Sequence, residues 1–223
     1  MKAIDVMVRD VVTVGPDTTV ADAVQLLAKH DVSSLPVIED GELIGIISEA
    51  DLLHRTELGT EKHRPWWLEA VTPASTLADE FAKSHGKQVA ELMTEDVVTV
   101  SEDTSLGEIA ALLERHRIKR VPVVIDGKLV GIVSRSNLIQ ALASHPTAPG
   151  DKVDEDRQIR QTLLGRLTEQ KWTDFGGRNI IVNSGVVHLW GLVGSDDERR
   201  ALVALAEGVP GVASVSDEMI PAY

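Results

Sequence analysis

The sequence predicts an α+β fold with a duplicated unit and a third, smaller unit, and three observations support this. Residues 7–53 align with residues 93–139 at a constant offset of 86 without a gap, and 20 of the 47 aligned pairs are identical. Each copy carries the pattern of a strand, a helix, a hairpin and a second helix. A stretch at 143–152, rich in Pro, Gly, Ala and Ser, then separates the copies from a segment of different pattern, as linkers do.

Each copy is predicted to fold as β-α-β-β-α. β-Branched residues favour the first strand, Ser and Thr favour helix starts, and Asp-Gly between two apolar runs is typical of a hairpin. In the order of the two copies, these signals are VVTV at 11–14 and 97–100, helix caps at Thr19 and at the Ser105–Glu108 capping box, turns at 40–41 and 126–127, and second helix starts at Ser48 and Ser134.

The third unit, residues 153–223, is predicted to form a small α-β-β-α-β domain. Its length of about 70 residues is enough for two layers around one core. We expect a helix that is capped by Asp154 and runs to about Gln170, strands at 179–182 and 186–193, a helix after the Ser195 capping box that stops at Pro210-Gly211, and a last strand from Val212.

The predicted domains are the first repeat at 1–54, a helical insert at 55–92, the second repeat at 93–142, the linker at 143–152 and the third domain at 153–223. The insert, with a helix expected at 78–93, is longer than an average connection, so we expect it to pack on the pair. Trp66 and Trp67 are expected to pack within the insert, and stacking on a base or filling a dimer interface are the alternatives.

Charge and composition exclude several function classes. The formal net charge of −13 opposes general binding to nucleic acid and to anionic lipid. The chain has no cysteine, so disulfides and thiolate chemistry are excluded, and its seven histidines show no paired metal-ligand spacing. We find no apolar run of the signal-peptide or membrane-span kind, and we expect a cytoplasmic protein without a metal.

Two segments join a strand end to a helix start with groups that suit a nucleoside phosphate. They are Gly45-Ile-Ile-Ser48-Glu-Ala-Asp51 and Gly131-Ile-Val-Ser134-Arg-Ser-Asn137. A helix N-terminus and a Ser hydroxyl attract phosphate, and a carboxylate one turn later accepts hydrogen bonds from a ribose diol. The alternative is a helix cap without function. The recurrence of the motif in both copies favours the ligand.

These motifs, with VVTV and the Pro-Val hairpins, resemble the cystathionine-β-synthase (CBS) domain over about 50 residues in each copy. The pair is therefore similar to a Bateman module. The resemblance implies two repeats packed about a pseudo-twofold axis, with two clefts between them. It implies ligands such as AMP, ADP or ATP, or NAD or S-adenosylmethionine, and association into a homodimer.

The resemblance also implies which residues would bind nucleotide. In the first copy Ser48 would contact phosphate and Asp51 the ribose, while in the second Ser134 matches and Asn137 replaces the family's Asp. An amide is a weaker partner for a diol than an anion is. The positions that would flank the adenine are Thr13, Val14, Leu35 and Pro36 in the first copy and Thr99, Val100, Val121 and Pro122 in the second.

A basic run at 115–120 distinguishes the second copy from the first. One interpretation is that Arg117, Lys119 and Arg120, together with Arg135, hold a phosphate chain, so that the second site prefers more phosphates than the first. The other is a solvated helix C-terminus stabilised by its dipole. The sequence favours neither.

The third unit resembles the BON domain (bacterial osmotic-shock and nodulation domain). The likeness rests on the run Val182 to Val193 with its Gly185 and Gly191, on the helix after Ser195, and on Pro210-Gly211-Val212. The resemblance implies phospholipid binding. Residues 151–223 carry 8 basic and 12 acidic side chains, a balance that opposes lipid and leaves protein interaction as an equal alternative.

The sequence therefore predicts a non-catalytic sensor that binds an adenine nucleotide and signals through contacts between repeats, between subunits or with the BON-like domain. An enzyme is disfavoured, because the clefts would need a general base or metal, and only Glu49 and Asp51 lie near the first. No catalytic cofactor is expected. The alternative is a scaffold with vestigial clefts whose BON-like domain binds lipid, envelope or protein partners.

Overall fold

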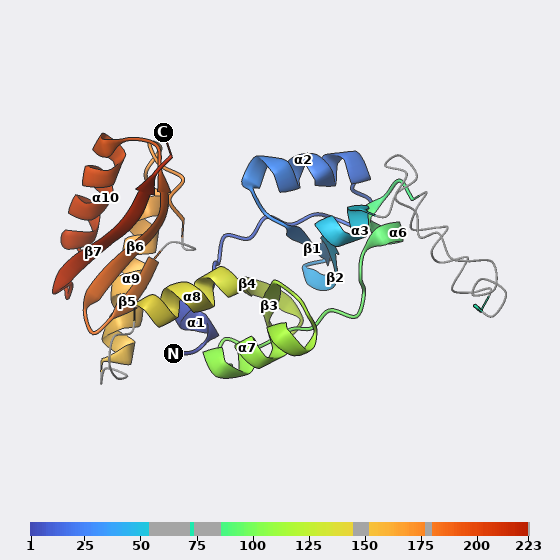
Figure 1. Ribbon diagram of the computed structural model, residues 1–223, viewed down its shortest axis with the longest axis horizontal. Helices are drawn as coiled ribbons and strands as arrows, with labels where there is room; N and C mark the ends of the chain where they lie inside the picture. Colours follow the sequence, from blue (N-terminus) through green and yellow to red (C-terminus); the bar gives the residue numbers. More distant parts are fainter. Residues whose placement is uncertain (54–71, 74–85, 145–151, 177–179, 223) are drawn as a thin grey trace. The chain divides into compact units, whose positions relative to one another are not determined.

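The computed structural model describes residues 1–53, 72–73, 86–144, 152–176 and 180–222. Within them the chain divides into two compact units (Figure 1). One unit comprises 12–98 and 126–129, and holds most of the first repeat. The other comprises 1–11, 99–125 and 130–223, and holds most of the second repeat together with the C-terminal domain.

The first repeat is a two-stranded hairpin packed on helices. Its elements are α2 (Val20–His30), β1 (Ser34–Glu39), β2 (Glu42–Ser48) and α3 (Glu49–Leu53), with α6 (Val89–Leu92) from the segment that follows. Thr19 caps α2 as predicted, since its side chain accepts a hydrogen bond from the backbone of Asp22. The hairpin turns at Asp40 and Gly41, both of which have positive φ, and Leu35, Val37 and Ile47 pack in the core.

The second repeat has the same elements at equivalent positions. They are α7 (Leu106–Arg115), β3 (Arg120–Ile125), β4 (Lys128–Ser134) and α8 (Arg135–Ala143), and α1 (Ala3–Val6) from the start of the chain packs with them. The predicted capping box of α7 is present, because Ser105 and Glu108 exchange hydrogen bonds. The α+β class and the duplicated unit are thus confirmed.

The strand expected at the start of each repeat is reduced to a single bridging residue. Val14 bridges to Val37, and Val100 bridges to Val123, both in parallel. The carbonyls of Pro36 and Pro122 accept the last hydrogen bond of each bridge, from Val14 and Val100, and proline has no N–H to continue the ladder. The expected VVTV strands at 11–14 and 97–100 are therefore too long.

The short helix that precedes each repeat packs on the other repeat. The helices α1 and α6 are equivalent at the offset of 86, and each is followed by a methionine, Met7 or Met93. A Cβ at Gly131 would come within 2.7 Å of the Met7 sulfur, and one at Gly45 within 2.5 Å of the Met93 sulfur. Glycine in β2 and β4 is thus needed for close packing against these methionines.

The C-terminal domain is a three-stranded sheet with two helices on one face (Figure 1). Its core contains residues from both helices and from the strands. The elements are α9 (Val153–Thr168), β5 (Ile180–Asn183), β6 (Val186–Val193), α10 (Asp196–Glu207) and β7 (Ser214–Pro221), with β5 antiparallel and β7 parallel to β6. This is the predicted α-β-β-α-β order.

Two details of this domain differ from the prediction. The helix α9 starts without a side-chain cap, and Asp154 lies inside its first turn, where a carboxylate stabilises the helix dipole. At α10, Ser195 accepts from the backbone of Glu198, but the Glu198 carboxylate accepts from Gly194 N–H and from Thr173, so the box is only half formed. In the insert, Trp66, Trp67 and residues 78–85 of the helix expected at 78–93 lie outside the described residues, and in the described remainder that helix was predicted too long, because only α6 at Val89–Leu92 is helical and Gln88 is extended and bridges to Thr19.

Candidate nucleotide sites

The first candidate site lies where β2 ends and α3 begins. The backbone N–H and the hydroxyl of Ser48 both donate to Oδ2 of Asp51, at 2.8 and 2.7 Å. Both side chains are partly exposed. This arrangement is a helix cap, and it also fixes the Asp51 carboxylate at the first turn of the helix. Its second oxygen is an acceptor that a ribose hydroxyl could use.

The remaining first-copy positions lie beside this cap. Ser34 pairs with Ser48 across the hairpin, Leu35 with Ile47 and Pro36 with Ile46. The carbonyl of Pro36 accepts from the N–H of Val14, which brings the exposed Thr13 next to the same end of the hairpin. Leu35 is fully buried in the core, so this position would offer a ligand its backbone only.

The second candidate site repeats this geometry at the start of α8. Ser134 donates from its N–H and its hydroxyl to Oδ1 of Asn137, at 2.9 and 2.7 Å. A backbone N–H can only donate, so the amide oxygen of Asn137 must face Ser134 and the NH₂ group must point elsewhere. Where the first copy has a second carboxylate oxygen, the second copy has the NH₂ group of Asn137, a residue that is buried with 4% exposed.

The adenine-flanking positions of the second copy lie as their counterparts do. The carbonyl of Pro122 accepts from Val100 N–H, and Thr99 beside it is exposed. Val121 is fully buried. Six of the eight flanking positions are therefore buried, namely Val14, Leu35, Pro36, Val100, Val121 and Pro122.

The basic residues of the second copy lie at and after the end of α7, in β3 and at the start of α8. Arg135 donates from Nε to the carbonyl of Ile118 and from Nη2 to that of Leu113, so it binds the C-terminal end of α7. Arg117 follows α7 in the left-handed conformation with φ 55°. Arg117 and Arg135 both line an apolar groove between α7 and α8. Lys119 is exposed, and Arg120 lies in β3, partly exposed.

Sequence reasoning missed Ser34. Its side chain is buried, with 6% of the residue exposed, and its hydroxyl has no hydrogen-bond partner among the described residues. Ser34 pairs with Ser48 in the hairpin and is equivalent to Arg120 at the offset of 86. A buried hydroxyl without a partner beside a candidate site is an argument for a ligand. The alignment of the two copies could have identified Ser34, because Arg120 was predicted to contact phosphate and Ser34 is its aligned counterpart.

Over the described ranges, no three His, Asp or Glu side chains are grouped so as to hold a metal ion. In the same part of the chain, no helix has the length and apolar character needed to cross a membrane.

Comparison with known proteins identifies both parts of the chain. The CBS domain matches residues 3–57 and 89–144, and the BON domain matches residues 155–220. The CBS domain-containing protein CBSX2, a chloroplastic protein of Arabidopsis thaliana, is 36% identical over 135 residues, which are 57% of each chain. An uncharacterized protein of Methanocaldococcus jannaschii, MJ1426, is 34% identical over 62% of this chain and 89% of its own length.

Among solved structures, the crystal structure of CBSX2 in complex with AMP superposes on this chain with a TM-score of 0.57 and 33% identity. The match covers 66% of this chain and 99% of that one. The curated full-length CBSX2 protein is longer, and the present chain spans 57% of it.

Proposed function

This chain belongs to the CBS-domain proteins and carries a BON domain at its C-terminal end, and from this membership we propose that it is a regulatory protein that binds an adenine nucleotide. The observation that carries the proposal is the doubled helix start, Ser48 with Asp51 and Ser134 with Asn137, in a chain similar to a CBS protein crystallised with AMP. We further propose a non-catalytic role in the cytoplasm, where adenine nucleotides are abundant.

The two sites differ in the hydrogen bonds they offer, and this predicts different ligand preferences. The first site presents a carboxylate, which suits the two hydroxyls of a ribose in AMP or ADP. The second lacks this carboxylate and has Lys119 and Arg120 nearby, which suits a ligand with more phosphates, such as ATP. NAD and S-adenosylmethionine remain candidates, since both contain adenosine.

Calorimetric titration of nucleotide-stripped protein with AMP, ADP, ATP, NAD and S-adenosylmethionine tests this proposal. The chain supplies its own matched variants, because Asn137 shows that an amide keeps the helix cap. Asp51→Asn should therefore fold normally and weaken binding at the first site, and Asn137→Asp should strengthen diol binding at the second. Saturable binding that responds to Asp51→Asn supports the proposal. Absence of binding by all five ligands overturns it.

A scaffold with vestigial sites is the second candidate function. The observation that favours it is that the second motif already forms a complete capping box without a ligand, and that Ser48 already donates two hydrogen bonds to Asp51 in the first. The BON domain would then bind the partner, whether lipid, envelope or protein. Co-sedimentation with liposomes at physiological salt, together with absent nucleotide binding, would establish this reading.

We also propose that the protein is a homodimer formed through its repeats. An apolar groove of about 970 Å³ lies between α7 and α8 and includes Leu106, Ala110, Ile139 and Leu142. Ile139 is 66% exposed, and Leu53, its counterpart in the first repeat, is 58% exposed. A face that is apolar and uncovered in both repeats suits a second copy of the chain. Light scattering should give twice the monomer mass, and Ile139→Lys should lower it.

A further inference from the structure

The BON domain uses the free face of its sheet to dock on the second repeat. The helices α9 and α10 cover one face, with Ile180 and Val182 of β5 in their core. Ile181 points to the opposite face, yet it is only 2% exposed. The helix α1 contacts β5 there, within the same compact unit. The face that α9 and α10 leave open is thus partly covered by the protein itself.

A buried arginine joins α1 to the BON domain. Arg160 of α9 is 5% exposed, and it donates from Nη2 to the carbonyl of Met7 at 2.9 Å and from Nε to that of Ile180 at 3.0 Å. Burial and the nearby Arg9 lower the pKa of Arg160 to about 10, with Asp5 acting in the opposite direction, so the side chain is still charged at neutral pH. A buried cation with two carbonyl partners requires this docked geometry.

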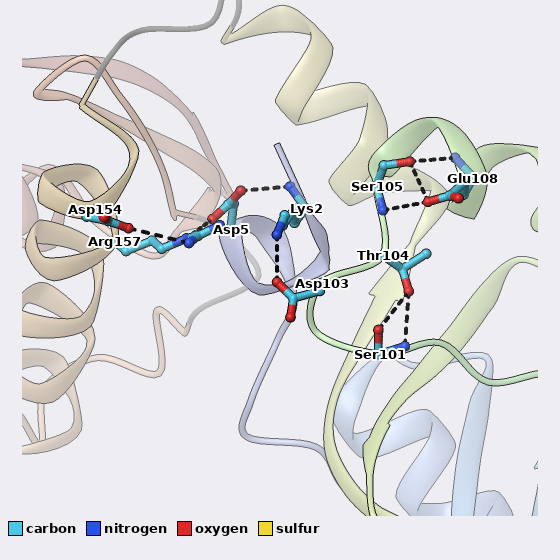
Figure 2. A network of polar contacts seen from close by, with 9 residues as sticks. All are labelled: Lys2, Asp5, Ser101, Asp103, Thr104, Ser105, Glu108, Asp154 and Arg157. Atoms are coloured by element: carbon cyan, nitrogen blue, oxygen red, sulfur yellow. Dashed lines mark hydrogen bonds and ion pairs between the residues drawn. The ribbon is translucent and has the colours of Figure 1, made fainter.

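Charged side chains around the buried Asp5 extend the same contact (Figure 2). Arg157 donates to Asp5 at 2.6 Å, and this bond raises the pKa of Arg157. The backbone N–H of Lys2 donates to the other Asp5 oxygen at 2.7 Å, and its ammonium group pairs with Asp103. The chain of contacts therefore runs from α9 through α1 to the loop that precedes α7.

The far end of α8 makes the second part of the contact. Ser144, the C-cap of α8, is fully buried, and its carbonyl accepts from Asn183 of β5 at 3.0 Å. Its hydroxyl accepts from the indole N–H of Trp190 in β6 at 3.2 Å. A single residue of the second repeat thus binds two strands of the BON sheet.

Both parts of this contact are connected directly to the second candidate site. Ser134 is the N-cap of α8, Asn137 lies in its first turn and Ser144 is its C-cap. One short helix therefore joins the site to the BON sheet. Val8, next to Met7, exchanges two backbone hydrogen bonds with Ile132 of β4, two residues before Ser134. A shift of the start of α8 at Ser134 would therefore displace both contacts to the BON domain, the one through Ser144 and the one through Met7.

We propose that ligand binding at the second site, and not at the first, is coupled to the docking of the BON domain through α8 and the Met7–Val8 segment. This rests on the proposed function, because it requires a nucleotide at the second site. The first-site residues Ser48 and Asp51 belong to the other compact unit and share none of these contacts. The BON domain is then the output element of one site.

Coupling of this kind is reciprocal, so releasing the BON domain must change nucleotide affinity at the second site. The test variant combines Arg157→Gln with Asn183→Ala, which removes one contact to α1 and one to Ser144. The matched control is Arg199→Gln, which removes an ion pair with Asp217 inside the BON domain, also at 2.6 Å. AMP and ATP are titrated in both, once with Asp51 intact to measure the first site and once with Asp51→Asn added to weaken that site and isolate the second.

We expect a change of at least fivefold in affinity at the second site in the test variant, less than twofold at the first site, and less than twofold at either site in the control. Hydrogen exchange provides a readout that needs no nucleotide, since α1 and β5 should exchange faster in the test variant. Faster exchange with unchanged affinity would refute the coupling. Unchanged exchange would refute the docking. If no nucleotide binds to any variant, the proposed function falls and the coupling with it, while exchange still reports docking.

Discussion

Arg160 donates a hydrogen bond to the backbone carbonyl of Met7, a residue 153 positions earlier in the chain. This bond ties the start of the first repeat's sequence to the C-terminal domain. The segment 1–11 consequently folds with the second repeat and the BON domain in one compact unit. The sequence order of the domains is therefore different from their structural grouping.

Replacing Arg160 by a residue that cannot donate hydrogen bonds should cause a large loss of stability. Arg160→Met keeps much of the side-chain volume but leaves the carbonyls of Met7 and Ile180 without this donor. Hydrogen bonds to a charged group contribute about 1.5–3 kcal/mol, so we expect a loss of about 2–3 kcal/mol in the free energy of unfolding. Chemical denaturation measures it.

Arg166→Gln is the control for that experiment. Arg166 also lies in α9 and donates to a backbone carbonyl, that of Gly208, but its hydrogen bond is exposed. The expected loss is below about 1 kcal/mol. Equal losses for the two substitutions would show that burial of Arg160 does not matter, and would contradict the role given to its two carbonyl partners.

Substitution by alanine should have opposite effects on stability at two glycines, Gly131 and Gly107. A Cβ at Gly131 would meet the Met7 sulfur at 2.7 Å and the Val8 carbonyl oxygen at 3.0 Å, so Gly131→Ala should destabilise by about 1–3 kcal/mol. At Gly107, in α7, a Cβ meets nothing within 4 Å, and Gly107→Ala should stabilise by about 0.5–1 kcal/mol. Thermal melts of both variants check the signs, and a stabilising Gly131→Ala would contradict the packing described.

Acid should weaken the fold through three carboxylates. Hydrogen bonds from Ser105 lower the pKa of Glu108, the Lys2 ammonium group lowers that of Asp103, and the backbone N–H of Gln88 lowers that of Glu91. A carboxylate with a lowered pKa in the folded state contributes stability above its unfolded value. That contribution is lost as the pH falls through the lowered pKa. Stability should therefore decline below about pH 4.5, the ordinary value for Glu.

Glu108→Gln isolates one part of this decline. Glutamine retains the geometry of the capping box but does not titrate. Urea denaturation between pH 6 and pH 3 should show a shallower loss of stability in the variant than in the parent protein. Equal slopes would mean that the capping carboxylate has the same pKa in the folded and unfolded states.

Local signals predicted the elements, and long-range contacts decided how they group. Local patterns predicted the Asp-Gly turns and the caps at Thr19 and Ser105, and the structure contains each of them. The offset of 86 predicted the two equivalent repeats, which the structure also contains. The VVTV strands were predicted too long, because the β propensity of a segment takes no account of a proline on the partner strand, which lacks an N–H. The docking through Arg160 and Ser144 involves residues far apart in the chain, and no single-sequence pattern marks them.

The sequence motif predicted which residues form the candidate sites, but it left both a ligand site and a helix cap as interpretations. Spacing placed Ser48 beside Asp51 and Ser134 beside Asn137, and the structure shows both pairs hydrogen-bonded. The direction of Arg135 could not be read from sequence, since it depends on the carbonyls at the end of α7. Ser34 was missed because serine in a strand gives no signal of its own.

Ser34→Ala should separate structure from binding at the first site. Its hydroxyl is buried without a partner in the described structure, so removing it should leave the free energy of unfolding unchanged or raise it by up to about 1 kcal/mol. If the hydroxyl bonds a nucleotide beside Ser48, affinity at the first site should fall about tenfold, the equivalent of about 1.4 kcal/mol. Denaturation and AMP titration on the same variant measure both. A clear loss of stability with unchanged AMP affinity would show instead that Ser34 serves the hairpin and not a ligand.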